Sequence, residues 1–263
     1  MQRKKFYVTL LLVVVILYRC AWAGEIALII DDIGNNLHDA SAFSLPRNVA
    51  ISILPHKALT ARYASLAAAQ QREVLLHMPM ESMSGLRQEP EVLLASMSDQ
   101  VISHRLQLAF ATVPNALGLN NHMGSRLTQL NGPMQVTMDY LGQRGLAFVD
   151  SRTTKFSHAE SIAKKNGVVT LRRHVFLDND LQVGKIDSQF KRLLRLAKKY
   201  GQALAIGHPH PQTLDYLRRN LPQLGKHNIR LITLSAMLAK IQPVDPLPER
   251  FDSTDPAYLG IAP

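Results

Sequence analysis

Short apolar runs recur along the chain, and each has the length and composition of a buried β-strand. They occupy residues 26–30, 49–54, 74–76, 116–119, 146–149, 203–206 and 229–232. Segments between them carry apolar residues at helical spacing, most clearly Leu94, Met97, Val101 and Leu108; Phe190, Leu193, Leu194 and Ala197; and Leu214, Leu217, Leu221 and Leu224. Because strands that alternate with helices are joined by crossover connections, the pattern predicts an α/β fold with a parallel sheet.

The number of strands indicates how this sheet is arranged. About seven parallel strands favour a closed or nearly closed (β/α) barrel over an open doubly wound sheet, since no glycine-rich phosphate loop follows the first strand. A globular part of roughly 215–220 residues is long enough to bury one core, so we predict a single domain over residues 24–241. Residues 242–263 are rich in proline and predict an extended tail.

The first 23 residues have the pattern of a signal peptide. A basic start at residues 3–5 precedes an apolar segment over residues 6–18, which is shorter than the approximately 20 residues of a membrane span. Ala21-Trp22-Ala23 fits a signal-peptidase site, so we expect export to a bacterial periplasm with Gly24 as the first mature residue. An uncleaved anchor is the alternative, and Arg19 disfavours it. No stable membrane span is expected after cleavage.

Charge and cysteine content limit the kinds of partner and of covalent cross-link that the mature chain can have. The signal segment carries four cationic residues and no acid, so its removal leaves a formal charge of +6 in place of +10. The remaining basic residues are dispersed, and together with export this argues against a nucleic-acid partner. The single cysteine, Cys20, lies in the signal segment, so the mature chain has no disulfide framework. The oligomeric state stays open.

Polar and ionisable residues follow five of the predicted strands, where each strand ends. They are Asp31 and Asp32; His77 and Glu81; Asn120, Asn121 and His122; Asp150 and Arg152; and His208 and His210. Taken singly, each could be a helix cap, a packing histidine or a salt-bridge partner. In a barrel these ends converge on one mouth, and carboxylates with imidazoles are ligands for a divalent metal, with zinc as the expected ion. Such a site can acidify water for attack on a carbonyl.

The motifs together resemble the divergent polysaccharide deacetylases, exported bacterial relatives of the polysaccharide deacetylases. The resemblance covers about residues 25–240 and is carried by residues 29–34, 77–81, 121–125, 175–179 and 207–211. It implies a distorted (β/α) barrel and metal-dependent removal of acetyl groups from amino sugars. It also implies roles for individual residues: Asp31 as the base, Asp32 as a metal ligand, His208 as the acid and Arg152 as the group that orients the base.

The metal motif departs from the family pattern of two histidines in one His-x-x-x-His segment, because His77 is followed at the fourth position by Glu81. We expect His122, from the next strand end, to replace the missing ligand, and Glu81 is the rival. Asp150 and His210 are further candidates for metal or substrate binding. Asp178 and Asn179 lie in an irregular segment and are expected to shape the cavity or hold a sugar hydroxyl.

Three functions are compatible with these residues. The first is an exported metal-dependent hydrolase that deacetylates N-acetylated amino sugars of an envelope polysaccharide. The second is a catalytically inactive glycan-binding or envelope-organising protein on the same barrel, which the altered metal motif favours. The third is an amidase or esterase that uses the same site on a different acyl substrate.

Overall fold

The computed structural model describes residues 23–84 and 91–241. The predicted signal segment up to residue 22 and the predicted tail over residues 242–263 lie outside the described residues. The strands are β1 Gly24–Ile33, β2 Ala50–Ile53, β3 Val74–Met80, β4 Ala116–Met123, β5 Ala147–Asp150, β6 Thr170–Arg172, β7 Val175–Phe176, β8 Gln202–Gly207 and β9 Ile229–Leu231. The helices are α1 Thr60–Ala69, α2 Asp99–Thr112, α3 Asn131–Gly142, α4 Ala159–Lys165, α5 Val183–Tyr200, α6 Pro211–Asn220 and α7 Leu234–Leu238.

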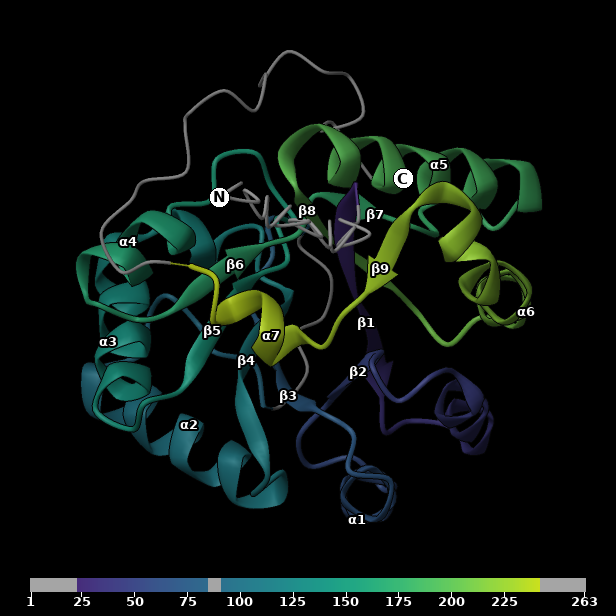
Figure 1. Ribbon diagram of the computed structural model, residues 1–263. Coiled ribbons are helices and arrows are strands. Elements are labelled where there is room, and N and C mark those ends of the chain that lie inside the picture. Colours follow the sequence, from purple (N-terminus) through teal and green to yellow (C-terminus); the bar gives the residue numbers. More distant parts are fainter. Residues whose placement is uncertain (1–22, 85–90, 242–263) are drawn as a thin grey trace, which may run out of the picture.

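The strands form one curled parallel sheet that the longer helices surround (Figure 1). Its order is β6-β5-β4-β3-β2-β1-β8-β7, and β9 pairs with the start of β1. The two end strands are separated in sequence by Arg173 and His174 alone. The Arg173 amide donates to the Asp150 carbonyl of β5, whereas the His174 amide donates to the Leu204 carbonyl of β8, both at 2.9 Å. One short segment thus joins both sides of the sheet, which confirms the predicted distorted (β/α) barrel.

All seven predicted strands are present. The prediction missed β6 and β7, which have three and two residues. β6 contains the polar Thr170 and Arg172 and β7 has two residues only, so neither forms an apolar run of strand length, and each is defined by its pairing with β5 or β8.

The predicted helical faces have different outcomes. Phe190, Leu193, Leu194 and Ala197 are buried on α5, as expected. The face predicted from Leu94, Met97, Val101 and Leu108 is wrong: Val101 and Leu108 are 43% and 46% exposed, and α2 buries Ile102, Leu106 and Ala109 instead. The helix begins only after Ser98, whose hydroxyl accepts a hydrogen bond from the Val101 amide, so Leu94 and Met97 precede the helix and cannot set its phase.

Side chains inside the barrel are apolar toward the amino-terminal ends of the strands and polar at the mouth formed by the carboxyl-terminal ends. The apolar part includes Ile29, Ala50, Leu75, Val149 and Ile206, and residues of α7 close its amino-terminal end, where that helix lies in front of the strands in Figure 1. Because alternate residues of a strand share a face, the residues two positions further along these strands also point inward: Asp31, Ser52, His77, Ser151 and His208. The polar mouth therefore lies at the carboxyl end of the sheet.

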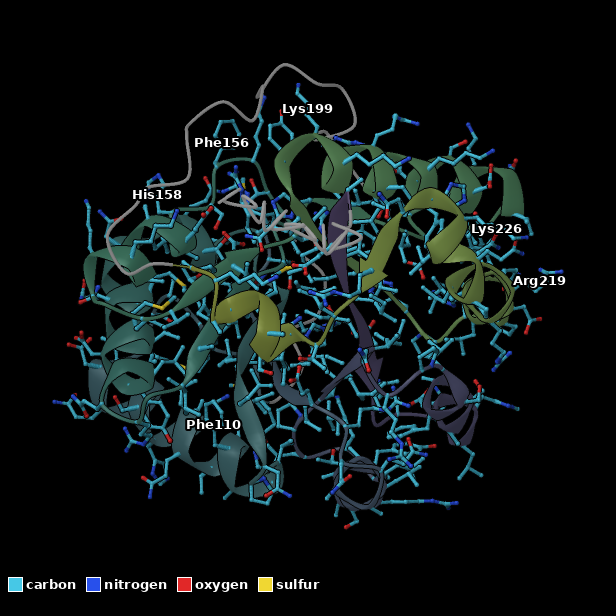
Figure 2. The ribbon with its side chains drawn as sticks, viewed as in Figure 1. Phe110, Phe156, His158, Lys199, Arg219 and Lys226 are labelled. Carbon is cyan, nitrogen blue, oxygen red and sulfur yellow. The ribbon has the colours of Figure 1, made fainter. Side chains whose placement is uncertain are left out.

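Basic side chains are spread over the outside of the molecule. Lys199, Arg219 and Lys226 are exposed and point outward from α5, α6 and the segment that follows α6 (Figure 2). Within residues 23–84 and 91–241, no helix combines the length and apolar character that crossing a bilayer requires.

Candidate metal centre

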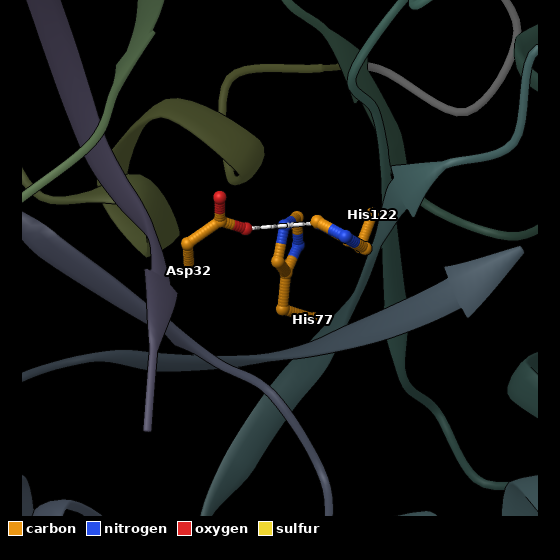
Figure 3. A group of neighbouring side chains, drawn as sticks. All are labelled: Asp32, His77 and His122. Carbon is orange, nitrogen blue, oxygen red and sulfur yellow. Dashed lines mark hydrogen bonds and ion pairs between the residues drawn. The ribbon is translucent and has the colours of Figure 1, made fainter. Parts of the chain in front are cut away.

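Asp32, His77 and His122 converge from the ends of β1, β3 and β4 (Figure 3). Asp32 Oδ1 lies 3.0 Å from His77 Nε2 and 2.9 Å from His122 Nδ1, and the two ring nitrogens are 3.2 Å apart. His77 is buried, whereas the side chains of Asp32 and His122 are 33% and 18% exposed. The buried His77 therefore fixes one side of the group, and the partly exposed Asp32 and His122 leave the other side open to solvent at the barrel mouth.

The backbone of β1 turns at Asp32 so that both carboxylates reach the mouth. Asp32 has a φ of 61°, a left-handed conformation that aspartate tolerates better than most residues, and the pairing of β1 with β2 shifts register here. The following turn is held by Asp39, whose Oδ2 accepts hydrogen bonds of 2.9–3.1 Å from the amides of residues 34–36. The Asp31-Asp32 pair is thus presented by a turn that a buried carboxylate stabilises.

These three donor atoms fit a cation better than they fit one another. Asp32 Oδ1 is buried and makes no well-oriented hydrogen bond, although two ring nitrogens lie within 3.0 Å. His77 Nδ1 lies 2.9 Å from Asn120 Oδ1 and donates to it, so Nε2 is the ring nitrogen that faces Asp32 and would offer its lone pair to a cation. Mutual separations of 2.9–3.2 Å are close to the edge of about 3.3 Å between tetrahedral ligands at zinc.

The two adjacent carboxylates have opposite electrostatic environments. Burial raises the pKa of Asp31, and the charge of Asp32 adds to this effect, although His77, His208 and Asn120 oppose it. Burial also acts to raise the pKa of Asp32, but the nearby imidazoles of His122 and His77 hold it well below its usual range. Asp31 is therefore the better proton acceptor, and Asp32 is the better permanent anion.

His208 follows β8 and approaches the group from another side. Its Nε2 lies 3.8 Å from Asp32 Oδ2, and its Nδ1 lies 3.0 Å from Asp178 Oδ1. Phe176 stacks on the imidazole with ring centroids 5.0 Å apart. Burial alone would lower the pKa of His208, but the hydrogen bond to Asp178 and the surrounding carboxylates raise it to about 9.

Glu81 does not join Asp32 and His77. Its Oε2 accepts a hydrogen bond from the Ala95 amide at 2.7 Å, and its Oε1 pairs with Arg126 at 2.8 Å. The structure thus brings His122, and not Glu81, to the other two candidate ligands.

Arg152 contacts Asp150 and the loop that follows β5. Its Nη1 is 3.8 Å from the buried Asp150 and donates to the Ser157 carbonyl. Asp150 accepts further hydrogen bonds from the Arg152 amide and the Ser157 hydroxyl. In this structure these contacts hold the loop after β5, and Asn120 donates hydrogen bonds to Asp31.

The remaining candidates lie at the edge of the site. Asp178, His208 and His210 form a second group with donor atoms within 4.8 Å of one another. Asp178 and His208 already contact each other in this group, with Asp178 Oδ1 3.0 Å from His208 Nδ1. His210 is exposed, and its ring centroid is 5.9 Å from that of His208. Asn179 is exposed.

Comparison with known proteins identifies the family. Residues 28–238 match the family described as divergent polysaccharide deacetylase. An uncharacterized protein of Haemophilus influenzae is 36% identical over 229 residues, which cover 86% of this chain and 80% of that protein. The uncharacterized protein YibQ of Escherichia coli is 35% identical over 224 residues, covering 84% of this chain and 69% of YibQ.

A solved structure shares the fold. The crystal structure of an uncharacterized protein from Agrobacterium tumefaciens C58 has a TM-score of 0.78 and 24% sequence identity, and the match covers 81% of this chain and 89% of that one. The chain belongs to the divergent polysaccharide deacetylase family, as its motifs indicated.

Proposed function

We propose that this protein is an exported, metal-dependent hydrolase that removes acetyl groups from N-acetylated amino sugars of an envelope polysaccharide. Membership of the family and the deacetylase-like fold support this class of reaction. The observation that carries the proposal is the convergence of Asp32, His77 and His122, with Asp31 and His208 beside them. A divalent metal, with zinc as the expected ion, would be held by these three side chains and would supply a Lewis acid for the acetamide carbonyl.

Asp31 is the proposed general base. Its Oδ2 lies 3.7 Å from His77 Nε2, so the carboxylate is adjacent to the proposed ligands while Asn120 holds it in place. Because burial raises its pKa, Asp31 can accept a proton from attacking water more readily than an ordinary aspartate can.

His208 is the proposed general acid. A pKa of about 9 keeps its imidazole protonated at neutral pH, and Nε2 is turned toward Asp32. A proton held there can pass to the amine that leaves when the amide bond breaks. Phe176 covers one face of the ring and limits its rotation.

The metal motif was the reason to consider an inactive glycan-binding protein. His122 reaches Asp32 and His77 from β4, so the altered motif no longer favours the inactive alternative over an enzyme. Export to the periplasm and the glycan substrate are parts of the proposal that rest on the signal-like residues 1–23 and on the family.

The test uses residues 24–263, purified without chelator, and N-acetylglucosamine oligomers as substrate. We expect near-stoichiometric metal by elemental analysis and release of acetate, with Asp31→Asn retaining metal while its turnover falls by about 10²–10⁴-fold. Stoichiometric zinc without acetate release from any N-acetylated amino sugar would contradict the deacetylase and would favour the inactive or the other acyl-hydrolase alternative.

A further inference from the structure

Asn120 occupies the centre of the polar mouth and is completely buried. It lies on β4, opposite His77 of β3 and Val149 of β5 in the sheet register. Four neighbouring side chains contact its amide group: Asp31, Ser52, His77 and Ser151. Asn120 therefore contacts both the proposed base, Asp31, and a proposed metal ligand, His77.

The orientation of the Asn120 amide follows from its neighbours. An ionised carboxylate can only accept, so the amide nitrogen must face Asp31, and Nδ2 donates to its two oxygens at 2.9 and 3.0 Å. The amide oxygen then faces the other way, 2.9 Å from His77 Nδ1 and 2.5 Å from Ser52 Oγ. His77 must donate from Nδ1 in this arrangement, which leaves Nε2 free as a ligand.

The neighbouring Asn121 shows what a purely structural asparagine does in the same strand. Its Nδ2 donates to the Met123 carbonyl at 2.7 Å, and its Oδ1 accepts from the Ser151 amide at 2.9 Å. Both partners are backbone groups, so Asn121 ties the end of β4 to the end of β5. Asn120 differs because its partners are side chains, two of them in the proposed site.

We propose that Asn120 is a positioning residue that couples Asp31 to His77: its amide nitrogen holds the base, and its amide oxygen fixes the tautomer and orientation of the ligand. The inference rests on the proposed function for the roles of these two residues. The group that links Asp31 to His77 is thus a neutral amide. An outer-shell partner of this kind affects metal affinity by about 10- to 100-fold.

Two substitutions separate the two halves of this role. Asn120→Asp retains an acceptor toward His77 Nδ1 but replaces the amide donor to Asp31 with a second carboxyl group, whereas Asn120→Leu loses both contacts. Asn121→Asp is the matched control. We expect zinc affinity, measured by chelator competition, to fall about 10- to 100-fold in Asn120→Leu and to stay within about 3-fold of the wild type in Asn120→Asp and Asn121→Asp.

Turnover of N-acetylglucosamine oligomers gives the second readout. Asn120→Asp is expected to lower kcat by about 100-fold with KM unchanged, because two carboxyl groups at this distance share a proton and Asp31 is no longer an ionised base, while the zinc ligands stay in place. If Asn120→Leu fails to fold, Asn120→Asp still decides, since the isosteric side chain preserves packing. Unchanged kcat in Asn120→Asp, or unchanged zinc affinity in folded Asn120→Leu, would overturn the inference.

These outcomes are distinct from a failure of the proposed function. A wild-type chain that binds zinc but releases no acetate overturns the deacetylase, while the zinc affinity of Asn120→Leu or, if that variant does not fold, of Asn120→Ala, which also removes the amide oxygen, still tests whether Asn120 positions His77. A wild-type chain that binds no zinc overturns both.

Discussion

Asp178 holds His208 through both oxygens of its carboxylate. Oδ2 accepts a hydrogen bond from the His208 backbone amide at 2.7 Å, and Oδ1 lies 3.0 Å from His208 Nδ1. The Thr213 hydroxyl also donates to Oδ2, so the carboxylate is fixed by three contacts. The proton on Nδ1 therefore faces Asp178, and Nε2 is the nitrogen available to the site.

We predict that Asp178→Asn lowers the pKa of His208 from about 9 toward 6.5, because burial lowers this pKa and the variant replaces the charged hydrogen-bond acceptor that outweighs burial with a neutral amide. The measurement is an NMR titration of the imidazole in chelator-treated protein. Asp180→Asn is the control, since Asp180 is exposed and its Oδ1 accepts from the Gln182 amide. A pKa that stays near 9 in Asp178→Asn would contradict the assigned cause.

The same pair affects stability with a defined sign. His208 is more basic in the folded chain than in the unfolded one, so its charge contributes to stability fully below pH 6.5, and the contribution is lost as the pH rises through about 9. In Asp178→Asn this part of the pH dependence is expected to disappear.

The choice of the third metal ligand gives a second prediction. His122→Ala should weaken zinc binding by at least about 100-fold, because it removes one of three convergent donors. Glu81→Gln should leave zinc affinity unchanged, since both oxygens of Glu81 already bind Ala95 and Arg126. Chelator competition on the two variants measures this directly. Weaker binding in Glu81→Gln with normal binding in His122→Ala would reverse the assignment.

The sequence was informative wherever a pattern repeats along the chain. Each of the seven predicted strands is a compact apolar run, and Asp31, His77 and His208 each come two residues after a buried inward position of the same strand. Alternation on a strand therefore places them at one mouth without knowledge of the fold.

The rest depended on contacts between distant segments. β6 and β7 exist because one segment pairs first with β5 and then with β8. Asn120 reads as an ordinary polar residue near a strand end, and only the register of β4 against β3 shows that it touches His77. The family resemblance implied that Arg152 orients the proposed base, and in this structure Arg152 contacts Asp150.

A third prediction concerns Arg72, which is buried and caps the connection between β1 and β2. Its guanidinium donates to the carbonyls of Phe43, Leu45, Pro46 and Val49. Arg72→Met should lower the free energy of unfolding by about 3–5 kcal/mol, because these carbonyls lose a charged donor. Urea denaturation measures the change. The exposed Arg47→Met is the control, with an expected effect within about 0.5 kcal/mol, and equal effects of the two substitutions would contradict the explanation.

His174 gives the last prediction, a pH dependence that originates where the barrel closes. Its Nδ1 accepts a hydrogen bond from the Leu204 amide at 3.0 Å, so this buried imidazole is neutral in the folded chain. Burial lowers its pKa from 6.5 to about 4, and the charge of Arg172 acts in the same direction. The unfolded chain therefore binds a proton more readily, and the contribution to stability is complete above pH 6.5 and is lost as the pH falls toward 4.

The corresponding experiment compares the wild type with His174→Asn, which keeps an acceptor near the Leu204 amide and does not titrate. Between pH 7 and pH 4 the free energy of unfolding of the wild type should fall by about 3 kcal/mol more than that of the variant, as the shift from 6.5 to about 4 implies. Asp31 and Asp150, whose pKa values are raised by burial, act in the opposite direction in both proteins and cancel in the comparison. Parallel pH profiles for the two proteins would show that His174 is not the titrating group.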